Sequence, residues 1–452
     1  MQTQIFMVHK RHLGLRAPTV LAVGFALTIL VGALVLMLPV SAADGQITPF
    51  LDALFTAASA SCVTGLVTVS TAVHWSVFGK CVILLLIQIG GLGFMSVAAI
   101  ASFVLRRTIT LHERMVMSAG LNLSDGGGIV RLTRRVLFGT FIIEGTGAVL
   151  LSCRFVPHYG FPKGITMGVF HAVSAFCNAG FDLMGTPDDP FQSLIGWAED
   201  PLVNITVMAL IVLGGLGFFV WSDVWDKHSF CRLRLHTKIV LTATAGLLLF
   251  GFGWTLLFEW SNPATLGAFD TPHKLLAAAF ESVTLRTAGF NTIDLGALTG
   301  PSQAVSCLLM FIGSTAGGIK TVTAAVLVLT AISAFCGRTT VSAFGRTIAP
   351  RSIMNAVTLL MAGGVLCLVG ACAIAGIEDA PFHQCLFEAV SAFGTVGVSM
   401  GLTPTLAAAS RVILIVMMYM GRVGVLTLGV AVFMRRREPP RLKYPDADVF
   451  IG

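Results

Sequence analysis

Long apolar runs alternate with shorter ones along the whole chain. Eight runs reach the length of about 20 residues that a helix needs to cross a bilayer, and they lie near 15–38, 77–104, 136–156, 202–221, 238–259, 302–335, 353–377 and 408–434. Between the members of each successive pair lies a shorter apolar stretch that ends in glycine, at 49–65, 164–180, 273–289 and 381–397. These stretches are too short to cross, so we expect re-entrant segments, which are tolerated only where protein or a water cavity covers their backbone.

The four short stretches are copies of one motif. Each runs from a phenylalanine to a glycine nine or ten residues later, and the sequences are Phe55-Thr-Ala-Ala-Ser-Ala-Ser-Cys-Val-Thr-Gly65, Phe170-His-Ala-Val-Ser-Ala-Phe-Cys-Asn-Ala-Gly180, Phe280-Glu-Ser-Val-Thr-Leu-Arg-Thr-Ala-Gly289 and Phe387-Glu-Ala-Val-Ser-Ala-Phe-Gly-Thr-Val-Gly397. Repetition of this kind outranks any local motif. It predicts an all-α polytopic membrane protein, in which four parallel repeats of helix, re-entrant pore helix and helix surround a central pore with pseudo-fourfold symmetry.

The repeats and the polar stretches between them divide the chain. We expect pore repeats at 17–104, 136–222, 238–335 and 352–434. The N-terminus (1–16), the three linkers and the C-terminal tail are expected on the cytoplasmic side, the linkers and tail at 105–135, 223–237, 336–351 and 435–452.

Composition and charge agree with this topology. Hydrophobic residues make up 55% of the chain and charged residues 11%, against about 25% charged residues in soluble domains, which excludes a soluble enzyme, a nucleic-acid binder and a disordered scaffold. With both termini inside, the cytoplasmic segments carry 21 Lys and Arg against 7 Asp and Glu, whereas the outer segments are net negative. The net charge of +7 therefore reflects the positive-inside rule rather than a nucleic-acid partner, and the negative outer face concentrates cations at the mouth.

The turns that end the four short stretches are candidate ion ligands. Pore helices that stop at mid-membrane direct the negative ends of their dipoles at a common axis, which favours a cation. Backbone carbonyls of the turns can replace the ion's hydration shell, and the glycines permit the backbone angles this requires. The expected filter residues are Val63, Thr64, Gly65, Asn178, Ala179, Gly180, Thr287, Ala288, Gly289, Thr395, Val396 and Gly397. Because none is acidic, neutral carbonyls would be the ligands, which suits a weakly hydrated monovalent ion such as K+; one such glycine alone would indicate only helix packing.

The chain resembles the Trk/Ktr/HKT superfamily of K+ transporters, and within it the bacterial Ktr membrane subunits. The resemblance covers essentially the whole chain, and it rests on the four turns together with Gly313-Ser-Thr-Ala-Gly-Gly-Ile-Lys320, Met420-Gly-Arg-Val-Gly424 and the end Lys443-Tyr-Pro-Asp…Ile-Gly452. It implies uptake of K+ across the bacterial plasma membrane through a filter like that of K+ channels, with Na+ coupling left open. Only the fourth turn reads Thr-Val-Gly, as K+ channels do, so the strictness of K+ over Na+ selection is also left open.

The third repeat carries a candidate gate. The run 302–335 is interrupted by glycines, and broken helices belong where they line a cavity. By resemblance this interruption is an intramembrane loop that gates the pore, and Arg422 is expected to hold its oxygens through the fork of guanidinium donors. The expected gate residues are Gly313, Ser314, Thr315, Ala316, Gly317, Gly318, Lys320 and Arg422. The alternative for the loop is a simple glycine kink. The alternative for the two cations is that their side chains reach the cytoplasmic interface, which suits Lys320 better than Arg422.

The resemblance also implies partners. Ktr membrane subunits form homodimers on a cytosolic nucleotide-binding regulatory ring of the KtrA type, and the C-terminus contributes to the dimer contact. No cofactor is expected in this chain. Gly90-Gly-Leu-Gly-Phe94 and Gly214-Gly-Leu-Gly-Phe218 follow no strand and lie in apolar runs, so we expect packing positions and not a dinucleotide site.

Two other classes of protein share some of these features. A secondary symporter for an organic solute also uses broken helices, but usually two of them in inverted repeats, whereas these repeats are parallel and one span is clearly broken. An intramembrane enzyme needs convergent catalytic groups, yet the spans hold only Glu144, Lys320 and Arg422, far apart in sequence. We expect Glu144 to hydrogen-bond a neighbouring helix, with coupling-ion binding as the alternative. The remaining polar positions of the short stretches, expected to make contacts behind the filter, are His171, Glu281 and Glu388.

Overall fold

The described part of the chain is mostly α-helical. The computed structural model describes residues 17–93, 129–313, 317–425 and 427–429, so the expected N-terminal segment, most of the 105–135 linker and the C-terminal tail lie outside the described residues. One hairpin joins β1 (Ser342–Ala343) to β2 (Arg346–Thr347), with Ser342 opposite Thr347. Short 3-10 turns connect the helices, and these are η1 (Pro39–Ser41), η2 (Ile195–Trp197), η3 (Phe230–Arg232), η4 (Leu266–Ala268), η5 (Leu295–Ala297) and η6 (Thr403–Thr405).

Each repeat begins with a long apolar helix. These first helices are α1 (Ala17–Leu36), α6 (Ile129–Tyr159), α10 (Leu235–Glu259) and α14 (Pro350–Ala375). They are the four described helices that are long and apolar enough to cross a membrane by themselves. Each exposes large apolar side chains on its outer surface, among them Leu27, Phe138, Leu257 and Met354. Apolar faces of this extent fit a lipid environment.

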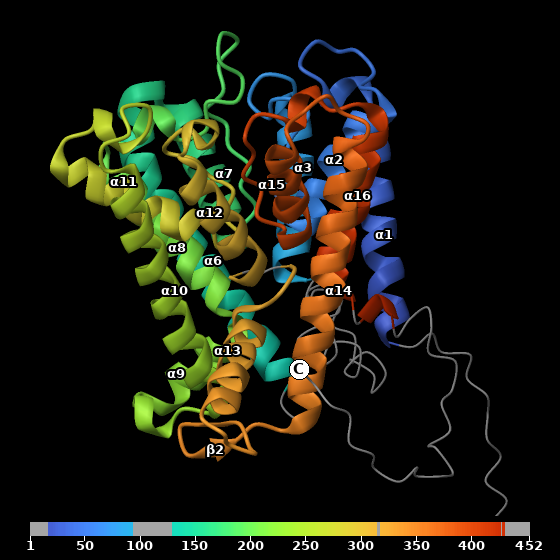
Figure 1. Cartoon of the computed structure of the whole chain (residues 1–452). Helices are drawn as coiled ribbons and strands as arrows, with labels where there is room; N and C mark the ends of the chain where they lie inside the picture. The colour runs from blue at the N-terminus through green and yellow to red at the C-terminus, as the bar shows by residue number, and fades with distance from the viewer. Residues whose placement is uncertain (1–16, 94–128, 314–316, 426, 430–452) are drawn as a thin grey trace, which may run out of the picture.

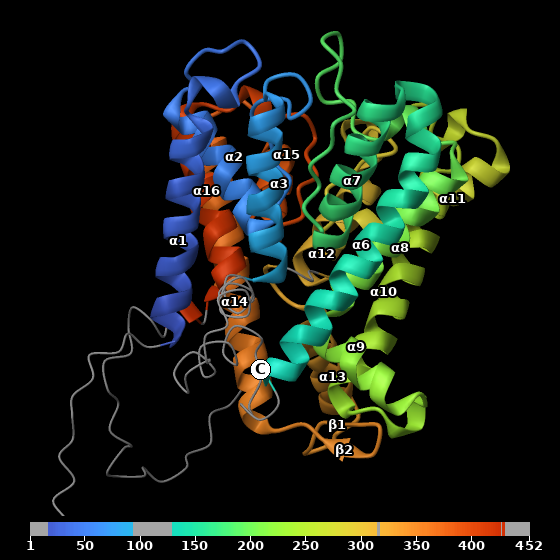
Figure 2. The same ribbon diagram turned by 180° about the vertical axis from the view of Figure 1, so that it is seen from behind.

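A short, buried helix follows each long one. The short helices are α2 (Phe50–Cys62), α7 (Phe161–Cys177), α11 (Thr271–Thr284) and α15 (Phe382–Gly394). With 13 to 17 residues each and a rise of about 1.5 Å per residue, they extend about 20–26 Å, which is less than the hydrocarbon thickness of about 30 Å. In Figures 1 and 2 all four lie in the upper half of the molecule.

The second helix of every repeat ends at a glycine. These helices are α3 (Val77–Leu92), α8 (Pro201–Leu216), α12 (Gly300–Ile312) and α16 (Ala408–Val423). From the sequence we expected only the third span to be broken, but Gly93, Gly217 and Gly424 have φ of +80°, +88° and +89°, a backbone that ends a helix and that side chains disfavour. Beyond Gly217 the chain turns by 91° into α9 (Phe218–Lys227), and beyond the third break it resumes as α13 (Thr321–Phe335).

Helices also extend into stretches that we expected as linkers. α6 begins at Ile129, α9 ends at Lys227 and α14 begins at Pro350. In Figure 1 α9, α13 and the hairpin form the lower end of the molecule, away from the short helices.

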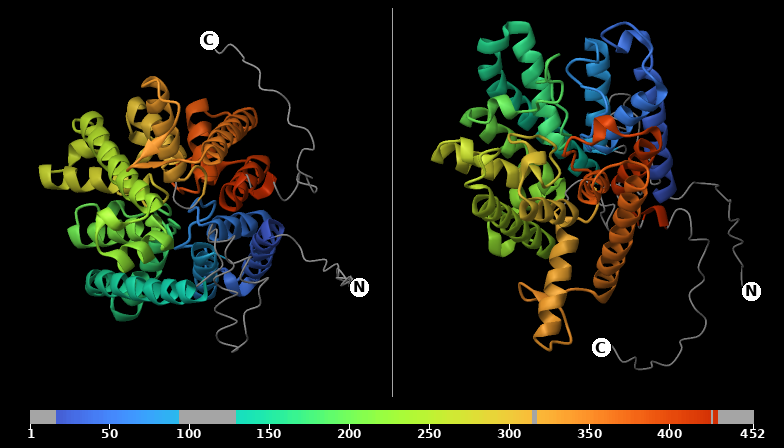
Figure 3. Two further views of the ribbon diagram at one scale, coloured as in Figure 1. Left: turned by 90° about the horizontal axis from the view of Figure 1, so that it is seen from below. Right: turned by 45° about the horizontal axis from the view of Figure 1, so that its top comes forward.

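The repeats follow one another around a common centre (Figure 3, left). The second helix of each repeat packs against the short helix of the next, in the pairs α3 with α7, α8 with α11, α12 with α15 and α16 with α2. The last pair joins the fourth repeat to the first, and an ion pair strengthens it, since Arg411 Nη1 lies 2.7 Å from Asp52 Oδ1. The core is therefore a closed ring of short helices, and the phenylalanines that open their motifs are all buried within it, namely Phe55, Phe170, Phe280 and Phe387.

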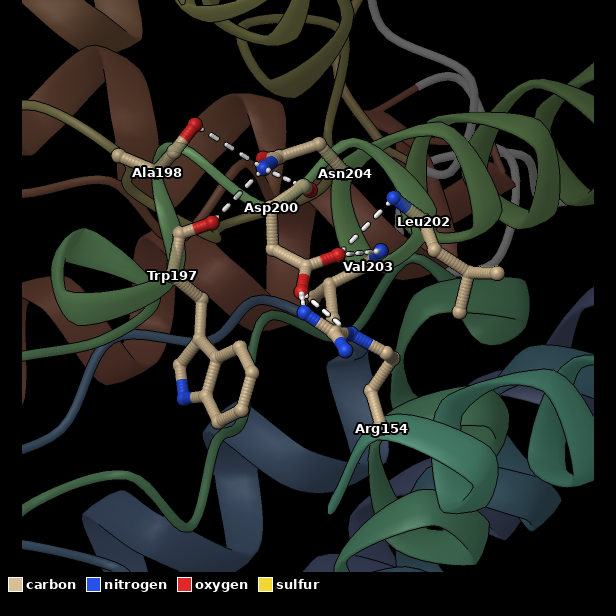
Figure 4. A network of polar contacts seen from close by, with 7 residues as sticks. All are labelled: Arg154, Trp197, Ala198, Asp200, Leu202, Val203 and Asn204. Atoms are coloured by element: carbon tan, nitrogen blue, oxygen red, sulfur yellow. Dashed lines mark hydrogen bonds and ion pairs between the residues drawn. The ribbon is translucent and has the colours of Figure 1, made fainter. Parts of the chain in front are cut away.

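A polar cluster fixes the start of the second helix in repeat two (Figure 4). Asp200 caps α8 by accepting hydrogen bonds from the backbone N–H groups of Leu202 and Val203, at 3.0 and 3.1 Å. The same carboxylate accepts from Arg154 Nε on α6 at 2.6 Å. The Asn204 amide donates to three carbonyls around the helix start at 2.7–3.1 Å, so α6 and α8 are tied together beside α7.

Candidate functional site

Each short helix ends in a turn with unusual backbone geometry. Val63, Asn178 and Thr395, which cap α2, α7 and α15, have φ of +58°, +58° and +52°. The third repeat differs, because α11 is capped by a residue in right-handed conformation and the positive φ of +75° falls on Thr287. Positive φ is an outlier for β-branched residues such as valine and threonine, and strain of this kind is typically found at functional sites.

The motif glycines lie two residues further along and are also left-handed. Their φ values are +101°, +67°, +80° and +91°, for Gly65, Gly180, Gly289 and Gly397. Left-handed positions two residues apart therefore recur in all four repeats. This repeated backbone pattern distinguishes the turns from an ordinary helix end, which needs only one such residue.

The four glycines form a closed ring. Each faces the carbonyl oxygen of the residue that precedes the glycine in the next repeat, and a side chain has no room between them. A Cβ atom would lie 2.6, 2.8 and 3.0 Å from that oxygen in the first three repeats and would overlap it in the fourth; the pairs are Gly65 with Ala179, Gly180 with Ala288, Gly289 with Val396 and Gly397 with Thr64. The centre of the molecule is thus built from backbone carbonyls and glycines, in the cyclic order of the repeats.

A hydroxyl group supports each turn from behind. In the first and fourth repeats the glycine N–H donates to a serine hydroxyl, from Gly65 to Ser59 at 3.0 Å and from Gly397 to Ser391 at 3.2 Å. In repeats two to four the hydroxyl donates to the carbonyl of the residue after the glycine at 2.5–2.7 Å, from Ser174 to Phe181, Thr284 to Phe290 and Ser391 to Val398. We did not identify these residues from the sequence, although the signal was present, since all four copies carry Ser or Thr four residues after the phenylalanine.

Removing one of these hydroxyls is expected to loosen the ring. Ser391→Ala deletes the bonds to Gly397 and Val398 and leaves a buried donor and acceptor unsatisfied, at a cost of about 1–3 kcal/mol. We expect a several-fold lower preference for K+ over Na+ in uptake, with protein still present in the membrane. Ser391→Thr keeps the hydroxyl and is the matched control. If the alanine variant has an unchanged preference for K+ over Na+, the hydroxyls do not contribute to ion selection.

A cavity of about 220 Å³ lies on one side of the ring. The four motif glycines line it, together with residues that follow them in every repeat, including Asp182 and Asp294. Both carboxylates are held by hydrogen bonds from the backbone two residues on, at 3.0 and 2.9 Å. The cavity therefore lies on the side of the ring that is formed by the residues following each turn.

The described part of the third-repeat loop contacts the helix end of the fourth turn. A Cβ atom on Gly317 would lie 2.6 Å from the Thr395 side chain, and one on Gly318 would lie 3.1 Å from the Gly394 Cα. Since Gly394 and Thr395 precede the residues that line the cavity, the loop meets the turn from the side opposite the cavity. The other expected gate residues Ser314, Thr315 and Ala316 lie outside the described residues, and Lys320 is exposed directly before α13.

Arg422 lies at the end of α16. Its Nη2 donates to the Gly90 carbonyl on α3, in the first repeat, so it connects the ends of two second helices. From the sequence we expected about three helical turns to follow Arg422; α16 ends one residue later, at Val423, and beyond Gly424 the described residues 425 and 427–429 are again helical. Its expected contact with the loop oxygens involves residues outside the described part of the chain and stays a prediction.

Glycines allow the second helices to approach the ends of the short helices. A Cβ atom on Gly90, Gly214 or Gly421 would overlap the carbonyl of a residue in the last turn of its own repeat's short helix, at Ser61, Phe176 and Phe393 respectively. The first two belong to the glycine-rich strings that we interpreted as packing positions, and the structure confirms that interpretation. In each case the glycine that ends the helix follows three residues later.

The polar residues at the start of the motifs lie behind the turns. His171 Nε2 accepts from the Leu183 N–H at 3.3 Å, and Glu388 accepts from Thr403 Oγ1 at 2.6 Å, as expected. For Glu281 the expectation of a polar contact was wrong, because its carboxylate is buried and has no hydrogen-bond partner among the described residues. Glu144 on α6 accepts from Gln88 Nε2 on α3 at 3.2 Å, which is the contact with a neighbouring helix that we expected.

Comparison with known proteins agrees with this architecture. Residues 10–438 match a protein family described as TrkH, cation transport protein. Among curated proteins, the chain is 42% identical to Ktr system potassium uptake protein B of Bacillus subtilis and 40% identical to potassium/sodium uptake protein NtpJ of Enterococcus hirae, in each case over 96% of both chains. The crystal structure of the potassium transporter TrkH from Vibrio parahaemolyticus is 16% identical in sequence and has a TM-score of 0.69, covering 94% of this chain and 86% of the other, so it shares the fold.

The family match, the closed ring of four turns and the apolar outer faces together identify a multi-pass membrane protein. Its four repeats are arranged as in K+ channels, and the similarity extends over nearly the whole length of the relatives. The chain belongs to the TrkH family of cation transport proteins.

Proposed function

We propose that the protein is the ion-translocating subunit of a bacterial K+ uptake system, and that the ring of four turns is its ion filter. The main observation in support is that each motif glycine contacts a carbonyl of the next repeat, in cyclic order. These contacts leave only backbone atoms at the centre of the ring. The relatives named for potassium uptake and for potassium/sodium uptake support the same cargo. A secondary symporter for an organic solute is not supported, because the matched family is described as cation transport and the relatives are named for potassium uptake.

The electrostatics of the ring suit a monovalent cation. Four short helices end at the ring, and each C-terminal end carries roughly half a negative charge from its dipole. The twelve filter residues contain no acidic side chain, so neutral carbonyls are the ligands, as in K+-selective filters. Asp182 and Asp294 in the cavity beside the ring raise the local concentration of cations before they enter.

The charge distribution supports an orientation for the protein. In this orientation the cavity faces the outside and both chain ends lie in the cytoplasm, because the segments assigned inside carry 21 Lys and Arg against 7 Asp and Glu, as the positive-inside rule requires. The membrane is the plasma membrane of a bacterium.

Uptake of K+ by cells that lack their own K+ transporters tests the function. Expression of this chain, together with a regulatory partner of the Ktr type, is expected to restore growth at low external K+ and uptake of labelled K+. Repeating the uptake with and without Na+ decides whether K+ transport is coupled to Na+. Transport of an organic solute with no K+ uptake would contradict the proposal.

The broken second helix of the third repeat, which consists of α12 and α13, acts as the gate. Gly317 and Gly318 contact the fourth turn from the cytoplasmic side in this orientation, where an ion leaving the filter must pass. Glycines give such a segment few side chains to pack, which lowers its local stability. Arg422, at the C-terminal end of α16, adds a positive charge that opposes a cation in the conduction path.

The protein works with partners. It forms a homodimer in the lipid bilayer, and a cytosolic nucleotide-binding ring of the KtrA type controls the gate; any nucleotide binds to that ring. Two relatives are named as proteins of a Ktr system, and this supports the presence of a partner subunit. The basic cytoplasmic segments supply a surface for it.

Removing the end of the chain is expected to weaken the dimer. Deletion of Tyr444–Gly452 removes Tyr444, Pro445, Val449, Phe450 and Ile451, whose apolar groups suit a subunit contact. We expect the truncated protein to shift toward monomer in chemical cross-linking and size-exclusion chromatography in detergent. A matched variant that changes only the acidic pair Asp446 and Asp448 to Asn should remain dimeric, and a truncated protein that stays a dimer would contradict the assignment.

A further inference from the structure

Arg286 is a buried cation at the base of the third turn. It directly precedes Thr287, at the place where the other repeats carry Cys62, Cys177 and Gly394. Its side chain is only 5% exposed. The expected filter and gate residues did not include it, although it is the only lysine or arginine in the four motif copies.

The Arg286 side chain lies against both sides of the break between α12 and α13, and its guanidinium bonds directly to the α13 side. Its Nη2 donates to Thr321 Oγ1, the first residue of α13, at 3.1 Å, and to Thr244 Oγ1 on α10 at 3.4 Å. The Thr321 hydroxyl in turn donates to the carbonyl of Gly313, which follows α12, at 3.4 Å. A Cβ atom on Gly313 would lie 3.4 Å from the Arg286 Cγ, so the arginine stem also packs against the end of α12.

The third turn differs from the others in how its helix ends, and it also bonds through a side chain to the neighbouring turn. The motif is one residue shorter in this repeat, and α11 ends in a right-handed cap, whereas the other short helices end in a left-handed one. Thr287 Oγ1 accepts a hydrogen bond from the Asn178 amide of the second turn at 3.4 Å. The third turn is therefore fixed between a neighbouring turn and the arginine that precedes it.

We propose that Arg286 is a positioning residue that couples the third turn of the filter to both halves of the broken helix. This inference rests on the proposed function of the ring. A displacement of α13 moves Thr321, and the guanidinium passes that displacement through one peptide unit to Thr287. The same residue thus allows the state of the broken helix to change the ion preference of the filter, and not only the size of the opening below it.

Removing the Thr321 hydroxyl tests the coupling without altering the filter. In full-length protein reconstituted into liposomes, Thr321→Val is expected to change the K+/Na+ flux ratio by about two- to thirtyfold, the range for residues within a coupling network. Thr321→Ser keeps the hydroxyl and should restore the ratio. Thr323→Val, two residues further along the same helix and with no role in these contacts, should leave it unchanged.

A double variant distinguishes coupling from two separate effects. Arg286→Gln should also change the ratio, and adding Thr321→Val should change it little further, because contacting residues in one network do not act additively. If Thr321→Val does not reach the membrane, Thr244→Val probes the same guanidinium from α10. A purely structural role would lower the amount of protein or the total flux at an unchanged ratio, and that result would overturn the proposal.

The filter itself provides the reference for these measurements. If Gly397→Ser changes the ratio while Thr321→Val and Thr244→Val do not, the coupling is wrong and the proposed function stands. If Gly397→Ser also leaves the ratio unchanged, the ring is not the filter, and the proposed function itself is wrong.

Discussion

Replacing Gly397 by serine is expected to reduce the preference for K+ over Na+ by about tenfold or more. The residue has a φ of +91°, and its Cβ atom would overlap the Thr64 carbonyl of the neighbouring repeat. A left-handed backbone alone costs a residue with a side chain about 1–3 kcal/mol, and about 1.4 kcal/mol corresponds to a factor of ten. The overlap adds to this cost and displaces the ion ligand itself, so Gly397 should be more sensitive than Gly289, whose Cβ atom would lie 3.0 Å from the next oxygen.

Gly401 is a matched control for this substitution. Its φ of +89° is nearly the same, but nothing lies within 4 Å of its Cβ position. Gly401→Ser therefore carries the backbone strain without the intrusion into the ring, and its ion preference should stay close to that of the native protein. Relative fluxes of K+ and Na+ in reconstituted liposomes measure both variants. Equal effects of the two substitutions would show that strain in the loop, and not closure of the ring, accounts for the loss.

Removing the gate is expected to raise K+ flux and to reduce its dependence on the cytosolic partner. Arg422→Ala removes a guanidinium that bonds to the Gly90 carbonyl and that we propose holds the loop. Hydrogen bonds to charged groups contribute about 1.5–3 kcal/mol, enough to shift a gate equilibrium by roughly 10- to 100-fold. Deletion of Gly313–Gly317 removes the loop itself and should act in the same direction.

Arg422→Lys separates charge from geometry. Lysine keeps the positive charge but lacks the planar fork of donors, so we expect flux between those of the native protein and Arg422→Ala. Uptake is measured with and without the partner, at equal protein levels in the membrane. If Arg422→Ala and the loop deletion both reach the membrane and depend on the partner as the native protein does, the gate lies elsewhere.

The central ring could be predicted from the sequence because its four parts are repeated. Gly65, Gly180, Gly289 and Gly397 align through the motif phenylalanines, and a requirement for glycine at the same place in four copies points to backbone packing around one axis. The hydroxyls behind the turns were visible in the same alignment. They were missed because serine and threonine at one helical position also satisfy themselves by bonding to their own helix.

The breaks in the second helices could not be read from the sequence in the same way. Gly90 and Gly93 are both glycines in an apolar run, yet the first permits close packing and the second ends the helix at φ of +80°. Hydropathy does not distinguish these roles, because apolar residues continue beyond the break. Arg286 was overlooked for a related reason, since its partners Thr244 and Thr321 are 42 and 35 residues away in the chain and only the fold brings them together.

The position of a bound ion tests the central claim most directly. Tl+ or Rb+, which replace K+ and scatter X-rays anomalously, can be soaked into crystals of the full-length protein. We expect an anomalous peak on the central axis, within bonding distance of the carbonyls that face the ring glycines, those of Thr64, Ala179, Ala288 and Val396. That peak should weaken in crystals of Gly397→Ser. An occupied ion site elsewhere in the molecule, with none at the ring, would contradict the assignment of the four turns as the filter.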